Sequence, residues 1–160
     1  CSDISKIKFK YNLDKYIVLF PFCSPHLILK KWPYYNNLVK KIKEKYQDFY
    51  KVIVVPGPNE IKESKDIDAI CILDNNKSLD ISQLSSIIKE SSFVIANDTG
   101  PAHIAAHLNA KGLALFGSHK SAILQSIERE NFKALQVTDL KKLSVEKVFE
   151  KIVRILNDQT

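Results

Sequence analysis

Apolar residues along the chain gather into short runs that alternate with amphipathic stretches. The runs are continuous, without intervening polar residues, which is typical of strands buried on both faces of a parallel sheet. Between them, apolar residues recur at helical spacing, as at Leu38, Val39 and Ile42, with Lys on the other face. The pattern predicts strands at residues 16–20, 51–55, 69–73, 93–96, 112–116 and 134–137. It predicts helices at residues 34–46, 81–90, 101–108, 122–127 and 145–156, and a short helix near residue 59.

Strands that alternate with helices predict an α/β fold, a Rossmann-like parallel sheet with helices on both faces and right-handed crossovers. Residues 1–15 show no firm periodicity and are expected to form a linker or lead-in segment, so the predicted domain spans residues 16–160. A chain of 160 residues with 45% hydrophobic content is long enough for one domain of ordinary size. Because it begins with Cys1 and contains no Met, we expect a piece of a longer protein.

Polar loops follow several of these strands, at the edge where ligands bind in open parallel sheets. The loop at residues 97–103 leads straight from a buried strand into a helix. The amides of Thr99 and Gly100 would face outward there at the positive end of the helix dipole. Gly100 would let an anionic group approach the main chain, and Pro101 suits a first helical turn, where no donor is needed. The stretch therefore predicts a phosphate site.

Composition sets broader limits on function. The chain has 24 Lys+Arg and 18 Asp+Glu, and this net charge of +6 is a mild indication of an anionic partner, although the spread of the Lys residues equally fits a solvated basic surface. Cys1, Cys23 and Cys71 lack a C-x-x-C pairing, which favours reduced thiols in the cytoplasm. No apolar run approaches the roughly 20 residues of a transmembrane helix, and no signal peptide is visible, so we expect a soluble protein.

Other kinds of site find little support in the motifs. Neither G-x-G-x-x-G nor G-x-x-x-x-G-K-[ST] occurs, which argues against a standard dinucleotide or P-loop site. His103 and His107 have the spacing of two zinc ligands, but Ile104 stands where H-E-x-x-H has Glu, so no metal site is predicted. A hydrolase with a Ser-His-Asp triad would need a G-x-S-x-G turn, which is absent.

Aromatic residues beside Lys30 and Lys31 allow two interpretations. Trp32, Tyr34 and Tyr35 could stack on nucleic-acid bases, or they could pack the start of the first long helix. We favour packing, and nucleic acid is not predicted as a partner.

Three segments occur in the order found in a known family: Lys30-Lys31-Trp32-Pro33, then Asn97-Asp98-Thr99-Gly100-Pro101-Ala102-His103-Ile104-Ala105-Ala106, then Leu115-Phe116-Gly117. In these segments the chain resembles glycosyltransferase family 9, the ADP-heptose:lipopolysaccharide heptosyltransferases. The resemblance runs from about Tyr16 to Leu156 and is to the C-terminal, donor-binding half of the family's GT-B architecture. It implies that the acceptor domain and the carboxylate that serves as general base lie in a missing N-terminal domain, so no catalytic residue is assigned.

The resemblance implies that the Thr99 and Gly100 amides, with the Thr99 hydroxyl, hold the donor's diphosphate as Pro101 starts the helix. Charge that builds on the leaving phosphate would then be stabilised in the transition state. Asp98 would accept hydrogen bonds from sugar hydroxyls, or else cap the helix. His103 would donate to a phosphate oxygen, or else be a buried histidine satisfied by backbone.

Two preceding loops carry further residues that the resemblance brings in. Lys30 occupies the family's position for a Lys that contacts phosphate or ribose; Lys31 is the alternative, and exposed loop charge is the plainer interpretation of both. Ser24 lies where the family has Ser or Thr near phosphate, although residues 22–26 lack the usual glycine. Glu60 lies where the family has an acidic residue near the nucleoside, and it could instead be a helix N-terminal charge.

Two functions follow as expectations. The first is the donor-binding domain of an inverting glycosyltransferase that transfers heptose from ADP-heptose, or a sugar from another nucleotide-sugar, to lipopolysaccharide core. It would act in the cytoplasm without a separate cofactor and could touch the inner membrane peripherally. The second is a non-catalytic module that binds a nucleotide or nucleotide-sugar. Adenine and heptose are implied by the resemblance alone, and the loop Gly117-Ser118-His119 departs from the family's usual sequence, which leaves sugar specificity open.

Overall fold

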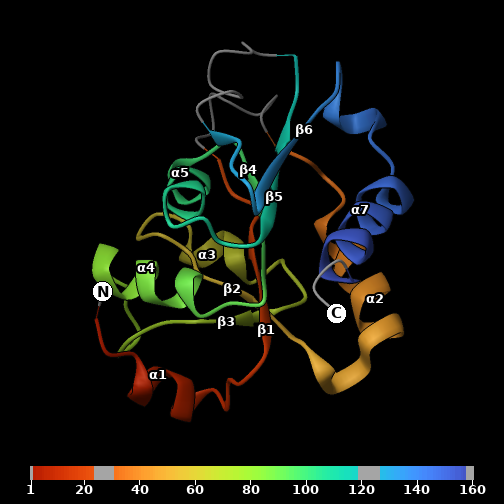
Figure 1. Cartoon of the computed structure of the whole chain (residues 1–160). Coiled ribbons are helices and arrows are strands. Elements are labelled where there is room, and N and C mark those ends of the chain that lie inside the picture. Colours follow the sequence, from red (N-terminus) through yellow and green to blue (C-terminus); the bar gives the residue numbers. More distant parts are fainter. Residues whose placement is uncertain (1, 24–30, 119–126, 158–160) are drawn as a thin grey trace.

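The computed structural model describes residues 2–23, 31–118 and 127–157. These residues build one sheet of six strands in the order β3-β2-β1-β4-β5-β6, and every neighbouring pair is parallel (Figure 1). The strands are β1 (Tyr16–Phe20), β2 (Lys51–Val54), β3 (Ile70–Cys71), β4 (Phe93–Asn97), β5 (Gly112–Phe116) and β6 (Phe132–Gln136). The strand order reverses between β1 and β4, which is the point where such sheets open a crevice for a ligand.

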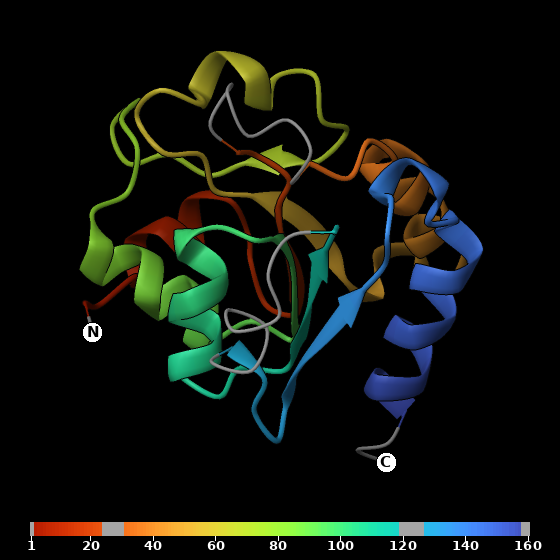
Figure 2. The ribbon, with the colours of Figure 1, turned by 90° about the horizontal axis from the view of Figure 1, so that it is seen from above.

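Helices cover both faces of this sheet. Their bounds are α1 (Ser5–Lys10), α2 (Tyr35–Tyr46), α3 (Ile61–Ser64), α4 (Ile81–Lys89), α5 (Gly100–His107) and α7 (Val145–Asn157), with 3₁₀ turns η2 (Gln47–Phe49) and η3 (Leu140–Lys142). Seen along the sheet from above, α4 and α5 lie on one side and α2 and α7 on the other (Figure 2). The sequence prediction of an α/β Rossmann-like sheet with helices on both faces is confirmed.

Alternate residues of the central strands divide the core into two layers. Tyr16, Val18 and Phe20 of β1 pack with residues of α1, α4 and α5, whereas Ile17 and Leu19 pack with residues of α2 and α7. Since both sets are buried, β1 is apolar at every position, as the continuous run in the sequence predicted.

Most predicted boundaries lie close to the observed ones. The weakest prediction is β3, where only residues 70–71 of the expected 69–73 pair with β2. Strand β6 starts at Phe132, ahead of the predicted residue 134. The helix expected at residues 122–127 lies outside the described residues except for Ile127.

The start of the chain differs from the expected linker or lead-in segment at residues 1–15. Residues 5–10 form α1, and Ile4, Ile7 and Leu13 are buried in the core layer shared with α4 and α5. The Ser86 hydroxyl of α4 donates to the backbone carbonyl of Ser2 at 2.7 Å. Three buried positions and the half-buried Tyr11 carry this packing, which is too few to produce a visible period in the sequence.

Gly112 at the start of β5 permits the close approach of two neighbouring strands. A Cβ atom at this position would lie 2.4 Å from the Val94 carbonyl oxygen and 2.8 Å from the Phe132 ring. We expect Gly112→Ala to lower the free energy of unfolding by about 2 kcal/mol or more through overpacking, measured by urea denaturation.

Gly100→Ala is the matched control. A Cβ atom at Gly100 would meet no neighbouring atom of the described residues within 4 Å, and neither glycine has a positive φ. The free energy of unfolding of Gly100→Ala should stay within about 0.5 kcal/mol of that of the parent protein. Equal denaturation midpoints for the two variants would contradict the packing assigned to Gly112.

Candidate functional site

The start of α5 places backbone donors at the carboxyl edge of the sheet. Strand β4 ends at Asn97, Thr99 is the N-cap residue with extended backbone, and Pro101 lies in the first turn. The Thr99 carbonyl accepts from the amides of Ala102 (3.1 Å) and His103 (3.4 Å). Within the part of the chain that the structure describes, the Thr99 and Gly100 amides donate to no acceptor. This arrangement presents donors and the positive helix end at the strand-order reversal.

Among the described residues, nothing crowds Gly100. The residue is exposed, and an added Cβ would lie more than 4 Å from any neighbouring atom of the described residues. The Thr99 hydroxyl makes only a long hydrogen bond, 3.4 Å to the Asn97 carbonyl, and it does not cap α5. An anion can therefore reach this main chain from solvent.

The Asn97 side chain joins the end of β4 to neighbouring segments by hydrogen bonds. Its side chain is completely buried, and the amide nitrogen donates to the Pro21 carbonyl at 2.9 Å. Its Oδ1 accepts from the Trp32 amide (3.3 Å) and the Tyr35 hydroxyl (3.1 Å). The end of β1 and the start of α2 are thereby tied to the end of β4. The sequence motif that includes Asn97 did not predict this role. The signal in the sequence is a polar residue that directly follows four apolar strand residues.

Two of the three aromatic residues at the start of α2 belong to the core. Trp32 is fully buried, and its Nε1 donates to the Leu143 carbonyl at 2.9 Å. The rings of Tyr34 and Tyr35 stand edge-on to it, with centroid distances of 5.9 and 5.1 Å. Burial raises the pKa of the Tyr35 hydroxyl above its ordinary value. Packing, the favoured interpretation, is thus what the structure shows for Trp32 and Tyr35.

Lys31 and Glu60 both have partners within the protein. Lys31 forms an ion pair with Glu63 of α3. Glu60 precedes α3 as its N-cap residue, and its Oε1 accepts from the Gly57 amide at 2.8 Å, which closes the turn after β2. Each side chain therefore holds a loop of the carboxyl edge in place.

Asp98 and His103 lie on either side of the helix start. Asp98 is buried, with 7% of its surface exposed, and it precedes the N-cap residue by one position. His103 is exposed and, together with His107 and Arg129, lines a hollow of about 460 Å³. The interpretation of His103 as a buried histidine is therefore wrong. Among the described residues, no group of three or more His, Cys, Asp or Glu could hold a metal ion.

The remaining sequence candidates cannot be placed. Ser24 and Lys30 lie outside the described residues, as does part of the loop after β5. The structure brings Asp98, Thr99, Gly100 and Pro101 together at one junction, with Lys31 and Glu60 on the loops after β1 and β2. Figure 2 looks down on this edge of the sheet.

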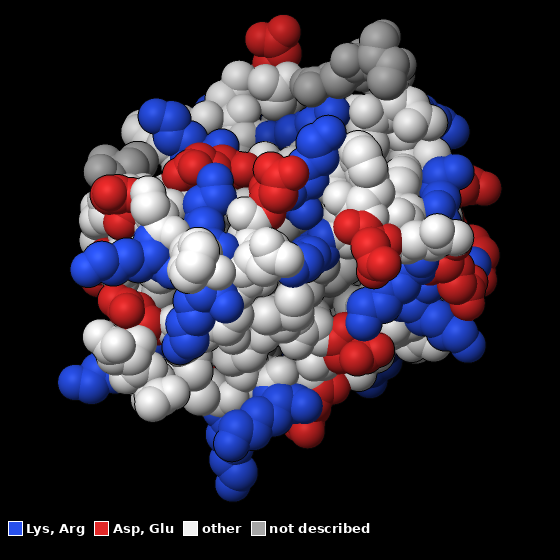
Figure 3. Space-filling model, turned by 90° about the horizontal axis from the view of Figure 1, so that it is seen from below, with Lys and Arg blue, Asp and Glu red and all other residues white. Residues whose placement is uncertain are grey.

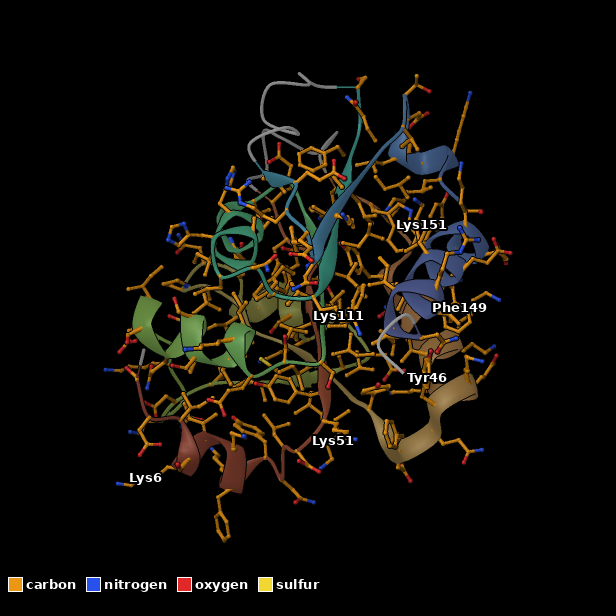
Figure 4. The ribbon with its side chains drawn as sticks, viewed as in Figure 1. Lys6, Tyr46, Lys51, Lys111, Phe149 and Lys151 are labelled. Carbon is orange, nitrogen blue, oxygen red and sulfur yellow. The ribbon has the colours of Figure 1, made fainter. Side chains whose placement is uncertain are left out.

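The opposite, amino edge carries surface hollows and many Lys residues. One hollow of about 600 Å³ has Lys43, Lys51 and Asp68 in its lining. Lys43 lies 3.6 Å from Asp68, and the Lys51 ammonium donates to the Asn12 carbonyl at 2.7 Å, so both cations have partners in the protein. Figure 4 shows Lys51 and Lys111 near the strand starts, and seen from below Lys and Arg are mixed with Asp and Glu (Figure 3). This mixture fits a solvated surface better than an anion site.

The bonds of Asn97 generate a prediction. Asn97→Asp would place a carboxylate oxygen against the Pro21 carbonyl and lose the amide donor. We expect a loss of about 3 kcal/mol of unfolding free energy at pH 7.5. Because the protonated acid can donate to Pro21, its folded-state pKa lies above its unfolded value, and the loss should shrink as pH falls from 7.5 to 5.

Urea denaturation at both pH values tests this dependence. Tyr35→Phe is the control, because it removes only the 3.1 Å bond to Asn97 and no titrating acid is added. It should cost about 1 kcal/mol at either pH. An Asn97→Asp variant that is as stable as the parent at pH 7.5 would show that the buried amide does not hold the junction.

Three solved structures resemble this fold closely. ADP-heptose lps heptosyltransferase II of E. coli has a TM-score of 0.74 at 16% identity, over 97% of this chain and 51% of that one. The E. coli heptosyltransferase WaaC with ADP has a TM-score of 0.74 at 18% identity, over 92% and 47%. The family 9 glycosyl transferase of Veillonella parvula has a TM-score of 0.74 at 14% identity, over 96% and 50%. This chain thus spans about half the length of each.

No helix among the described residues is long and apolar enough to cross a membrane.

The family is identified by a sequence profile. A search of curated protein sequences found no match to the chain. The sequence profile of glycosyltransferase family 9 (heptosyltransferase) matches residues 3–153, and the parallel sheet is that of one half of a GT-B enzyme. The chain therefore belongs to glycosyltransferase family 9.

Proposed function

We propose that this chain is the donor-binding half of a glycosyltransferase and that it binds the diphosphate of a nucleotide-sugar where β4 meets α5. The observation that supports this most directly is the pair of amides at Thr99 and Gly100, which have no acceptor among the described residues and lie at the strand-order reversal. Two donors at a helix start suit a diphosphate, because the helix dipole and the amides favour the same charge.

The reaction assigned to this site transfers the sugar by direct displacement. An acceptor hydroxyl oxygen bonds to the sugar carbon, and its proton passes to the general base, while the bond between that carbon and the phosphate oxygen breaks. Negative charge then gathers on the departing nucleoside diphosphate. The Thr99 and Gly100 amides are already fixed by α5, so they stabilise that charge without reorganising. The Thr99 hydroxyl can exchange its long 3.4 Å bond for a shorter one to a phosphate oxygen.

Neighbouring residues complete the proposed donor site. Asp98 accepts from sugar hydroxyls, and His103, which is exposed, donates to the phosphate. Ser24 and Lys30, which follow β1 in the sequence and lie outside the described residues, would add phosphate contacts, and Glu60 would accept hydrogen bonds from the ribose hydroxyls. Pro101 keeps the first turn of α5 in place.

Family membership supports ADP-heptose as the donor and lipopolysaccharide core as the acceptor. Solved structures of the E. coli enzyme WaaC are described with ADP and with ADP-2-deoxy-2-fluoro heptose. We place the general base and the acceptor site in an N-terminal domain outside this chain. The reaction would then run with inversion at the cytoplasmic face of the inner membrane.

Charge at position 100 tests the diphosphate site. Gly100→Asp adds a carboxylate in the first turn of α5, where it favours the helix but repels a diphosphate. We expect ADP to bind at least about tenfold more weakly to Gly100→Asp than to the neutral Gly100→Asn, a difference of about 1.4 kcal/mol. Calorimetric titration at low ionic strength measures both affinities.

Adenosine serves as the control ligand, since it lacks phosphates and should bind the two variants equally. Thermal melting should show both variants folded, because nothing lies within 4 Å of an added Cβ. Equal affinity of ADP for both variants, or no heat from the parent with ADP or any other nucleoside diphosphate, would remove the site from this junction.

A second candidate is a non-catalytic module that binds a nucleotide or nucleotide-sugar, because the Thr99 and Gly100 amides could hold a phosphate without any reaction. We expect the 160-residue chain to bind ADP but to release none from ADP-heptose in the presence of lipopolysaccharide-core acceptor. A coupled ADP-release assay would detect turnover. Turnover by a longer form that includes an N-terminal half favours the enzyme over the module, and turnover by this chain alone would show that no general base is missing.

A further inference from the structure

An ion pair joins two loops of the proposed donor site. Lys31 lies at the end of the loop that follows β1, and Glu63 lies in α3, which follows β2. Because β1 and β2 are neighbours in a parallel sheet, both loops emerge at the same carboxyl edge. The two side chains are largely covered, with 29% and 39% of their surfaces exposed.

The segment at residues 31–35 is held on its other side by β4. The Trp32 amide and the Tyr35 hydroxyl both donate to Asn97, while the Trp32 ring is buried in the core. Lys31 thus reaches from this segment toward α3, on the β2 side of β1. Helix α5 follows β4, on the other side of β1 in the strand order. An ammonium that already bonds a carboxylate on the β2 side is poorly placed to serve the Thr99 and Gly100 amides' ligand.

We infer that Lys31 and Glu63 are positioning residues of the donor site: their ion pair anchors the segment at residues 31–35 to α3, and Lys31 does not itself bind phosphate. This inference rests on the proposed function. It assigns to Lys31 the anchoring of residues 31–35 in place of phosphate contact. A fixed loop end lowers the ordering cost of binding, which the anchor supplies in advance.

Glu63→Ala distinguishes an anchor from a ligand, because the two roles predict opposite results. If the pair anchors the loop, the variant should bind ADP about three- to tenfold more weakly. If Lys31 binds phosphate, the variant should bind ADP equally or more tightly, because the ammonium is released from its carboxylate.

The charge swap supplies the rescue. Lys31→Glu alone sets two carboxylates against each other and should weaken ADP binding more than Glu63→Ala does. Combining Lys31→Glu with Glu63→Lys restores the pair in reverse, and affinity should return to within about threefold of the parent. A direct phosphate ligand cannot be rescued in this way, so a swapped protein that binds as poorly as Lys31→Glu would overturn the inference.

The pair between Lys8 and Glu90 is a matched control. It joins α1 to the end of α4 at 3.0 Å, and its side chains are 30% and 45% exposed, close to the values of the other pair. Glu90→Ala should leave ADP affinity unchanged. If it weakens binding as much as Glu63→Ala does, the effect is a general loss of charge and the inference is wrong.

Hydrogen exchange of the Trp32 amide tests the anchor without any ligand. This amide donates to Asn97 next to Lys31, and Glu63→Ala should speed its exchange. Unchanged exchange together with unchanged ADP affinity would overturn the anchoring. A parent protein that binds no nucleoside diphosphate, with exchange still faster in the variant, would instead mean that the proposed function fails while the anchor stands.

Discussion

The structure depends on one buried amide. Asn97 lies at the end of β4 with no exposed surface, and a polar side chain in that position is costly unless its hydrogen bonds are made. Its partners are the Pro21 carbonyl, the Trp32 amide and the Tyr35 hydroxyl, which come from the end of β1 and the start of α2. The amide therefore fixes the two strands between which the strand order reverses, and α5 begins three residues beyond it.

Small residues allow α5 to pack against the sheet. Ala102, Ala105 and Ala106 form its buried face, so the helix can lie close to the sheet and bring its first turn to the carboxyl edge.

Two glycines differ in what surrounds them. At Gly112 the Val94 carbonyl and the Phe132 ring leave no room for a Cβ atom, whereas at Gly100 no neighbouring atom of the described residues lies within 4 Å of an added Cβ. The first serves packing, and the second leaves the main chain accessible to a ligand.

Charge acts locally in this protein. The net charge of +6 suggested an anionic partner, yet Lys8, Lys31 and Lys43 each face a carboxylate. The feature that suits an anion is instead the main chain at Thr99 and Gly100, where donors come from backbone geometry. Net charge therefore does not indicate where on this protein an anion would bind.

The sequence by itself determined which segments form strands and helices along the chain, because strands buried on both faces need continuous apolar runs. It also located the start of α5, since the change from strand to helix at residues 97–101 is set by neighbouring residues. Only the tertiary structure decided the packing of α1, the burial of Trp32 and the exposure of His103. The partner of Lys31 is likewise a tertiary matter, because Glu63 lies 32 positions along the chain. Contacts between distant segments form only when the sheet brings two segments to the same edge. They cannot be predicted from a local pattern of residues.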